Sequence, residues 1–337
     1  MMTLYPAVLF AISFFLTLIL MPYWIRKAHQ IKLVWKDMNK QENRLVAGSG
    51  GVIVLGSFIV GVLFFIAYRI FYLHTVDYLV EILSLLVTMT LLGGIGLIDD
   101  LLGWQRGGLS PRSRVLLALL ASLPLVVINA GRASISLPFL GGVNLGLIYP
   151  LVLIPLGVVG ASTTFNFLAG FNGLEAGQGI LILSALSVVA YFTGDHWLAV
   201  IGICMIASLL AFLMFNLFPA QVFPGDCLTY PVGGMIAIMA ILGNFEKIAV
   251  WFFIPVIIEV ILKARGRFVK PSFGRPEKDG SLQVPYEKFY GLTHVALWAQ
   301  RRFGIKPDER KAVLLIWGFQ LVIIILGFII FSGGIFH

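Results

Sequence analysis

Acidic and amide side chains that could do chemistry lie where apolar segments of the chain end. They are Asp99 and Asp100 in GGIGLIDDLLGW, Asn166, Asn172 and Glu175 in NFLAGFNGLEAGQG, and Asp226 in FPGDCLTYP. In a lipid environment such residues persist only against protein, water or an ion. A site built from carboxylate and amide oxygens, without histidine or cysteine ligands, favours Mg²⁺ or Mn²⁺ over zinc.

A basic run, KARGRFVKP, follows a later apolar segment and places Arg265 and Arg267 two residues apart. Two guanidinium groups at this spacing can bind a phosphate through paired hydrogen bonds. A magnesium ion beside arginines suits phosphoryl transfer, in which catalysis is mostly positioning and charge neutralisation.

Each motif taken alone also has a structural explanation. The Asp99–Asp100 pair could simply be solvated acids that end a helix, although adjacent carboxylates repel and acids are disfavoured at a helix C-terminus. Asp226 could be an N-cap residue. Arg265 and Arg267 could be basic anchors at the membrane surface.

The composition predicts an integral membrane protein. Of the 337 residues 59% are hydrophobic and only 12% are charged, with a mean hydropathy of +0.96. A soluble protein carries about twice that fraction of charge. We therefore predict an all-α polytopic membrane protein that forms one domain over residues 1–337.

Apolar runs of spanning length predict about ten transmembrane helices, each of about 17–25 residues. The runs begin near Leu4, Val46, Tyr78, Arg114, Leu145, Ala176, Trp197, Tyr230, Glu246 and Lys311. The first run is followed rather than preceded by basic residues, so we expect an uncleaved helix with its N-terminus outside. Ten helices then place the C-terminus outside as well.

The distribution of basic residues supports this topology. All but three of the 24 Lys and Arg residues lie in residues 26–44, 106–114 and 263–311, which the helix count places in the cytoplasm. This bias accounts for most of the net charge of +8. Because the charge is explained by membrane topology, we expect no nucleic-acid partner. The same topology brings the acids, amides and arginines to the cytoplasmic face, where residues 263–310 would complete an active site.

The chain resembles the polyprenyl-phosphate N-acetylhexosamine-1-phosphate transferases over nearly its whole length. The resemblance rests on four motifs in the same order: IDDLLGW, NFLAGFNGLEAGQ, FPGD and RGR. NGLEAGQ is closer to the archaeal and eukaryotic dolichyl-phosphate GlcNAc-1-phosphotransferases than to the bacterial enzymes. The resemblance implies Mg²⁺-dependent transfer of GlcNAc-1-phosphate from UDP-GlcNAc to a dolichyl phosphate. The products would be UMP and dolichyl-diphospho-GlcNAc, in the first lipid-linked step of N-glycan-type assembly.

The resemblance also implies residue roles. Asn166 and Asp226 would bind the metal. The catalytic residues would be Asp99, Asp100 and Arg114, and Asp99 would orient or deprotonate the lipid phosphate. Asn172 and Glu175 would border the uridine, and Arg265 and Arg267 would contact the diphosphate. Arg114 stands where the family has a lysine, and Gly266 stands where it often has a histidine. The short segment after the basic run favours an archaeal enzyme in the cell membrane over a eukaryotic one in the endoplasmic reticulum. The family also makes a homodimer plausible.

Two kinds of alternative stay open. The first is the same reaction with another UDP-N-acetylhexosamine, because backbone groups could recognise the acetamido group. The second is a transporter, since polar residues and glycine breaks in a helical bundle also describe substrate pathways. The grouping of the polar residues at one face and the absence of an internal repeat in the sequence favour the transferase.

Overall fold

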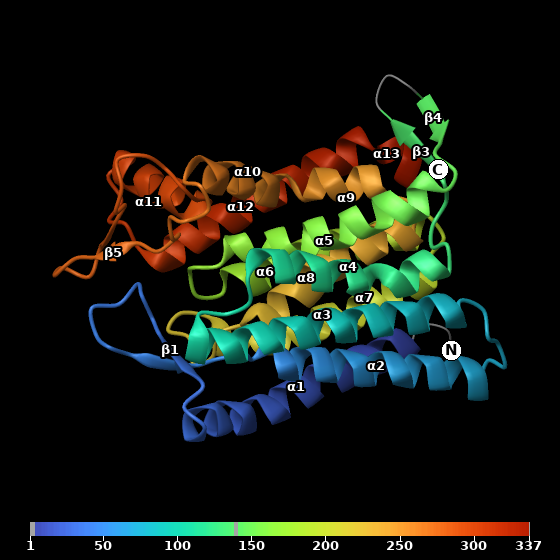
Figure 1. Ribbon diagram of the computed structural model, residues 1–337, viewed down its shortest axis with the longest axis horizontal. Coiled ribbons are helices and arrows are strands. Elements are labelled where there is room, and N and C mark those ends of the chain that lie inside the picture. The colour runs from blue at the N-terminus through green and yellow to red at the C-terminus, as the bar shows by residue number, and fades with distance from the viewer. Residues whose placement is uncertain (1–3, 138–140, 337) are drawn as a thin grey trace.

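The structure is a computed structural model that describes residues 4–137 and 141–336. It is a bundle of long helices that run between two ends of the molecule (Figure 1). The helices are α1 (Leu4–Gln30), α2 (Gly51–Phe71), α3 (Leu79–Arg106), α4 (Pro111–Val127), α5 (Ile154–Phe165), α6 (Leu174–Phe192), α7 (His196–Asn216), α8 (Asp226–Leu242), α9 (Glu246–Phe252), α10 (Ile254–Arg265), α11 (Leu292–Arg302), α12 (Glu309–Ile330) and α13 (Ser332–Ile335). A π-helical turn, Tyr149–Leu153, leads into α5, and a 3₁₀ turn, Asn166–Leu168, follows it.

Three short antiparallel hairpins add strands to the predicted all-α fold. They pair β1 (Val34–Lys36) with β2 (Leu45–Ala47), β3 (Ser134–Leu137) with β4 (Gly141–Asn144), and β5 (Arg275–Pro276) with β6 (Leu282–Gln283). In the first hairpin Trp35 lies opposite Val46. All three hairpins lie in the connections between helices, so the core of the molecule is helical.

Seven of the described helices are long and apolar enough to cross a membrane, by length and composition. The three other predicted spans are present as shorter helices: α4 and α8 have 17 residues each, and the ninth is split into α9 and α10 at Phe253. Pro255 explains the split, because proline has no N–H to donate and its ring clashes with the preceding turn. The structure thus supports a polytopic membrane protein with seven candidate spans, and the count of ten stays a prediction.

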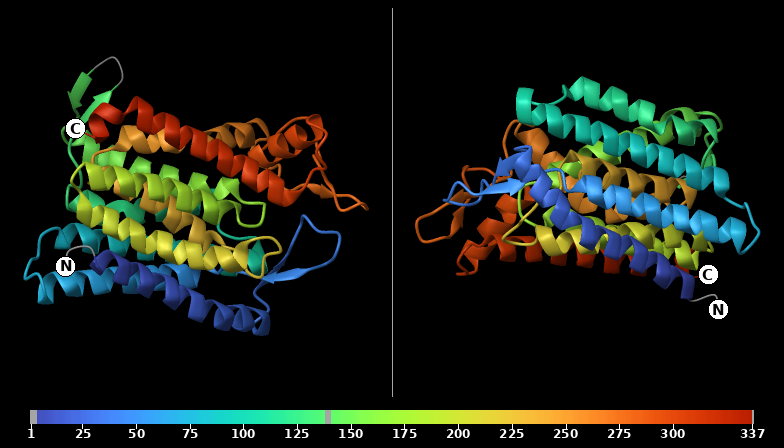
Figure 2. Two further views of the ribbon diagram at one scale, coloured as in Figure 1. Left: turned by 180° about the vertical axis from the view of Figure 1, so that it is seen from behind. Right: turned by 90° about the horizontal axis from the view of Figure 1, so that it is seen from below.

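The predicted cytoplasmic connections gather at one end of the bundle. Figure 1 shows the β1 and β5 hairpins and α11 at one end, and both termini with the β3–β4 hairpin at the other. The views from behind and from below agree (Figure 2). The end that holds β1, β5 and α11 is called the polar end below, and we predict that it faces the cytoplasm.

Helix α8 forms the centre of the bundle. Every residue of α8 from Cys227 to Leu242 is buried, as expected for a helix that is apolar all round. Glycines allow its neighbours to approach: a Cβ at Gly96 of α3 would lie 2.3 Å from the carbonyl oxygen of Asp226, and one at Gly233 would lie 2.2 Å from that of Ala161. Small residues at helix interfaces permit this close packing in membranes.

The topology can be tested by labelling engineered thiols in oriented vesicles. The native Cys204 and Cys227 are buried, so background labelling should be low. Glu42→Cys places a thiol on an exposed residue of the polar end, and Val76→Cys places one at the opposite end, where the side chain is 67% exposed. We expect an impermeant maleimide to label position 42 only from the cytoplasmic side and position 76 only from the outside. The reverse pattern would invert the topology.

Candidate active site

A cavity of about 640 Å³ opens at the polar end, within the usual size range of ligand sites. It is lined by residues from α3, α4, α6, α7 and α8, from the 3₁₀ turn after α5, from β1, and from the connections at that end. Seven residues predicted from the sequence line it: Asp99, Asp100, Arg114, Asn166, Asn172, Glu175 and Asp226.

Asp100 caps a helix other than its own. Its Oδ1 accepts the backbone N–H of Asp226 at 2.8 Å, and its Oδ2 accepts that of Cys227 at 3.3 Å and the hydroxyl of Ser49 at 2.9 Å. These N–H groups belong to the first turn of α8, which has no partners for them within the helix. Because Gly225 at the N-cap has no side chain to do this, the carboxylate from α3 takes its place, and Asp226 does not have to cap its own helix.

Asp99 is fixed by a tight turn after α3. Gly107 and Gly108 both have positive φ, and the turn returns the chain so that Leu109 N–H donates to Asp99 Oδ1 at 2.7 Å. Arg114 reaches both carboxylate oxygens, with Nη2 3.1 Å from Oδ1 and Nε 2.6 Å from Oδ2. This paired contact holds the guanidinium at the cavity wall.

Asn166 and Asp226, the predicted metal ligands, are direct neighbours. The Asn166 amide donates to Asp226 Oδ1 at 2.8 Å, although the residues come from α8 and from the 3₁₀ turn after α5. No set of three or more His, Cys, Asp or Glu side chains in the described residues is arranged to hold a metal by itself. One amide and one carboxylate are hard oxygen donors, and they fit Mg²⁺, which usually keeps other ligands from water or substrate.

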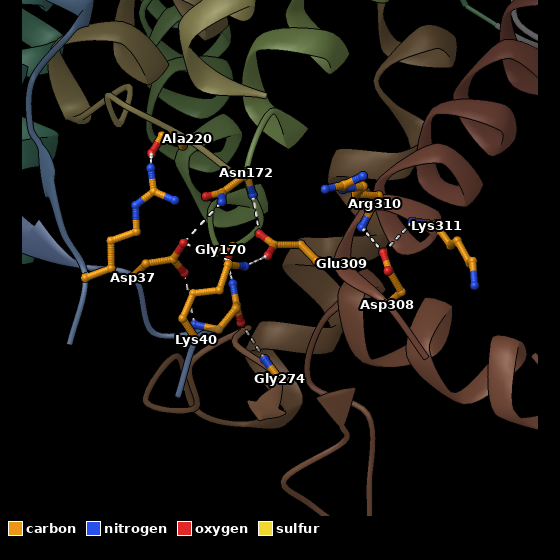
Figure 3. A network of polar contacts seen from close by, with 12 residues as sticks. Asp37, Lys40, Gly170, Asn172, Ala220, Gly274, Asp308, Glu309, Arg310 and Lys311 are labelled. Carbon is orange, nitrogen blue, oxygen red and sulfur yellow. Dashed lines mark hydrogen bonds and ion pairs between the residues drawn. The ribbon is translucent and has the colours of Figure 1, made fainter. Parts of the chain in front are cut away.

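Asn172 and Glu175 line the cavity and have a separate set of contacts. The Asn172 side chain donates to Asp37 Oδ2 at 3.2 Å, and its backbone N–H donates to Glu309 Oε1 at 2.7 Å (Figure 3). Glu175 is buried in the first turn of α6. Gly173, at the N-cap of α6, has a φ of +86°, which a residue with a Cβ adopts only with strain.

Arg265 and Arg267 are not brought to the cavity. Both are exposed at the end of α10 and in the turn that follows, and neither lines the cavity. The turn lies beside the site, since the ring of Phe268 packs on that of Phe167 with 5.5 Å between centroids, and Phe167 follows Asn166.

The sequence motifs did not include several residues that line the cavity. Asp37, Met38 and Asn39 come from the β1–β2 connection, and Phe273 from the segment after α10. Their segments are polar or short and have no periodicity that marks a site. The one indication of a site role in the sequence was the polar segment Asp-Met-Asn-Lys, which lies between the basic residues Lys36 and Arg44.

A buried cluster holds the segment that carries Phe273 into the cavity wall. Glu259 accepts the Ser272 hydroxyl at 3.2 Å and the Leu292 N–H at 2.6 Å. His294 is fully buried, and its Nδ1 accepts the Tyr290 N–H at 3.2 Å while Nε2 lies 3.3 Å from the Phe273 carbonyl oxygen. Burial lowers the pKa of His294 to about 4, so the ring is neutral at pH 7 with its proton on Nε2.

The fold and the cavity are those of a polytopic membrane enzyme with its polar site at one end of the bundle. The family described as "Glycosyl transferase family 4" matches residues 82–244. A Saccharolobus solfataricus protein, provisionally named UDP-N-acetylglucosamine–dolichyl-phosphate N-acetylglucosaminephosphotransferase, is 34% identical over 323 residues, 95% of this chain and 94% of the relative. The chain therefore belongs to glycosyl transferase family 4, the polyprenyl-phosphate N-acetylhexosamine-1-phosphate transferases.

Two further relatives show the range of the family. The UDP-N-acetylglucosamine–dolichyl-phosphate N-acetylglucosaminephosphotransferase of Dictyostelium discoideum is 28% identical over 284 residues, 73% of this chain and 68% of its own. A phospho-N-acetylmuramoyl-pentapeptide-transferase of Clostridium perfringens is 33% identical over 176 residues, 50% of this chain and 55% of its own. The similarity thus extends to family members named for different sugar substrates.

Gly225→Ala should destabilise the protein, because it adds a Cβ at a φ of +71° and 2.3 Å from Asp100 Oδ2. With ψ at 169°, this backbone conformation is essentially restricted to glycine and costs about 1–3 kcal/mol for another residue. Gly56→Ala is the matched control, since a Cβ there meets nothing within 4 Å and alanine favours a helix. Thermal unfolding in detergent should show a lower midpoint for Gly225→Ala and an equal or higher one for Gly56→Ala. Equal midpoints for the position-225 variant and wild type would contradict the cross-helix cap.

His294 should make stability fall in acid. Because the folded pKa of about 4 lies below the unfolded value of about 6.5, the contribution is complete above pH 6.5 and is lost as pH falls towards 4. Other groups titrate there too, so the test is the difference between wild type and His294→Gln. The unfolding midpoint of wild type should drop more between pH 6.5 and 4 than that of the variant. Parallel curves would exclude a buried neutral histidine.

Proposed function

We propose that the protein transfers GlcNAc-1-phosphate from UDP-GlcNAc to dolichyl phosphate, giving dolichyl-diphospho-GlcNAc and UMP. The observation that carries the proposal is the meeting of Asn166, Asp226 and the Asp99–Arg114 pair in one cavity. The 34% identity to the Saccharolobus relative over 95% of this chain supports the same substrates.

Charge in the cavity supports a metal requirement. Five of the described lining residues are Asp or Glu, and two, Lys36 and Arg114, are basic. Both proposed substrates are anionic, so the acidic surplus would repel them unless a cation intervenes. We propose that Asn166 and Asp226 hold Mg²⁺, which when bound would neutralise the diphosphate and the developing charge.

The reaction is proposed as a direct exchange of diphosphate bonds. A phosphate oxygen of the lipid attacks the phosphorus that bears the sugar, and the bond from that phosphorus to the oxygen shared with UMP breaks as UMP leaves. Arg114 would orient the lipid phosphate, and Asp99 would keep the guanidinium in place. Asp100 would act through α8, because it holds the helix start that carries Asp226.

Asn172 and Glu175, which line the cavity, are proposed to border the uridine. Arg265 and Arg267 lie outside the cavity, so we propose that they attract anionic substrates to its rim rather than contact the reacting diphosphate. The archaeal relative favours a cell membrane, and the distribution of basic residues favours this end in the cytoplasm.

Another UDP-N-acetylhexosamine is the second candidate substrate. The Clostridium relative, which is named for a phospho-N-acetylmuramoyl-pentapeptide substrate, keeps 33% identity over half of this chain. This leaves the sugar open at the level of the family, while the reaction remains the transfer of a sugar 1-phosphate to a polyprenyl phosphate.

The proposal is tested by transfer of radiolabelled sugar phosphate from UDP-GlcNAc to dolichyl phosphate by the purified protein, followed by lipid extraction. We expect Mg²⁺-dependent label in the lipid and an equal amount of UMP. Asp226→Ala and Asn166→Ala should each lower turnover at least 100-fold, the scale of removing an electrostatic group from a reaction centre. The exposed variant Glu42→Gln is the control and should keep wild-type rates. Wild-type rates in both site variants would overturn the metal assignment, and no transfer from any UDP-N-acetylhexosamine would overturn the function.

A further inference from the structure

We propose that residues 37–40, Asp-Met-Asn-Lys, act with Glu309 as a clamp that positions the nucleotide side of the cavity. The term clamp is used below for these four residues and Glu309. The inference rests on the proposed function for the identity of the substrate, but the contacts of the clamp do not depend on it. Its members come from the β1–β2 connection and the first residue of α12.

Asn39 joins two loops that are far apart in the sequence. Its side-chain Nδ2 donates to the Gly170 carbonyl oxygen at 2.6 Å, and its Oδ1 accepts the Gly274 N–H at 3.0 Å. The residue is 5% exposed. A planar amide that donates on one side and accepts on the other suits this bridge, and neither alanine nor leucine could replace it.

Lys40 and Glu309 form the charged half of the clamp. Lys40 Nζ pairs with Glu309 Oε2 and lies 3.7 Å from Asp37 Oδ2. The Lys40 side chain is 20% exposed and those of both acids are 2% exposed. One lysine therefore serves two buried carboxylates, each of which would be costly to leave without a partner.

The two acids transmit this pairing to Asn172. Glu309 Oε1 accepts the Asn172 backbone N–H, and Asp37 Oδ2 accepts its side-chain amide. Asn172 is thus held at both its main chain and its side chain by groups that Lys40 fixes. The neighbouring Gly170 and Gly173 have positive φ, and because glycine loses more conformational freedom on folding than other residues, the outside contacts help to order this loop.

Lys40 also ties the clamp to the segment that leads to Asp226. Its Nζ lies 4.0 Å from the ring centroid of Phe218, and Arg310 lies over the same ring at 4.3 Å. Phe218 belongs to the connection between α7 and α8. The clamp therefore contacts the connections after α5, α7 and α10 together.

Lys40 and Glu309 are positioning residues, because neither lines the cavity, whereas Asn172 does. Loss of the clamp should therefore weaken binding of the UDP-sugar and leave the lipid phosphate side, around Asp99 and Arg114, nearly unaffected. A misplacement of a binding group by a small distance is enough to lower affinity.

Hydrogen exchange of the full-length protein in detergent, without substrate, tests the clamp independently of activity. Glu309→Ala removes the acceptor of the Asn172 N–H, so exchange at that amide should rise about tenfold or more, the scale of one lost hydrogen bond to a charged group. Glu309→Gln keeps an acceptor oxygen and should show a smaller rise. Asn39→Ala should raise exchange at Gly274 by a similar factor, and the exposed Glu42→Gln should change neither. Wild-type exchange at Asn172 in Glu309→Ala would overturn the clamp.

Transfer kinetics then test its role. We expect Lys40→Gln and Glu309→Ala to raise the KM for UDP-GlcNAc about tenfold and to change the KM for dolichyl phosphate less than twofold. Lys40→Arg, which keeps the charge, should keep most of the affinity for UDP-GlcNAc. Equal rises in both KM values, or a lower kcat with both KM values unchanged, would show a merely structural role and overturn the proposal. An inactive wild type would contradict the proposed function alone, since the exchange result would still stand.

Discussion

The first backbone N–H groups of α8 need hydrogen-bond acceptors from another helix, and the rest of the site depends on this constraint. Gly225 brings the chain into α8 with positive φ and no side chain, so the first N–H groups of the helix need an acceptor from elsewhere. Asp100 supplies it from α3, and the close approach is possible because Gly96 leaves room for the backbone of Asp226. Gly96 and Asp100 from one motif and Gly225 from another thus form one structural unit. This unit directs Asp226 to Asn166.

The basic side chains at the polar end are held by buried acids. Arg114 pairs with Asp99 at the cavity wall, and Lys40 pairs with Glu309 beside Asp37, which lines the cavity. In both places a basic side chain is paired with an acid from another segment, because isolated charges at a partly buried site are costly. Asp226 has an amide rather than a basic residue as its hydrogen-bonded side-chain neighbour. This is the position at which a bound divalent cation would balance the acidic surplus.

The sequence predicted much of this arrangement for definite reasons. Apolar length and the distribution of basic residues placed Asp99, Asp100, Asn166 and Asp226 at one end of a helical bundle, and the structure brings them together. The sequence could not predict that Asp100 caps α8, because that hydrogen bond joins residues 126 positions apart. The clamp was missed for the same reason, since Lys40 and Glu309 are 269 positions apart. The spacing of Arg265 and Arg267 within the basic run predicted a phosphate-binding role, but both are exposed and neither lines the cavity.

The depth of the cavity also bears on the choice between enzyme and transporter. Thr229 is the last residue of α8 that lines it, and Tyr230 closes that level by donating to Asp99 Oδ2 at 3.4 Å. Beyond Tyr230, α8 continues as PVGGMIAIMAIL, wholly buried and without a polar side chain. A substrate pathway through the bundle along this central helix would need polar partners at mid-depth, and α8 provides none. A cavity confined to one end, open to water and bordered by lipid-facing helices, instead suits a reaction between a soluble nucleotide sugar and a phosphate at the membrane surface.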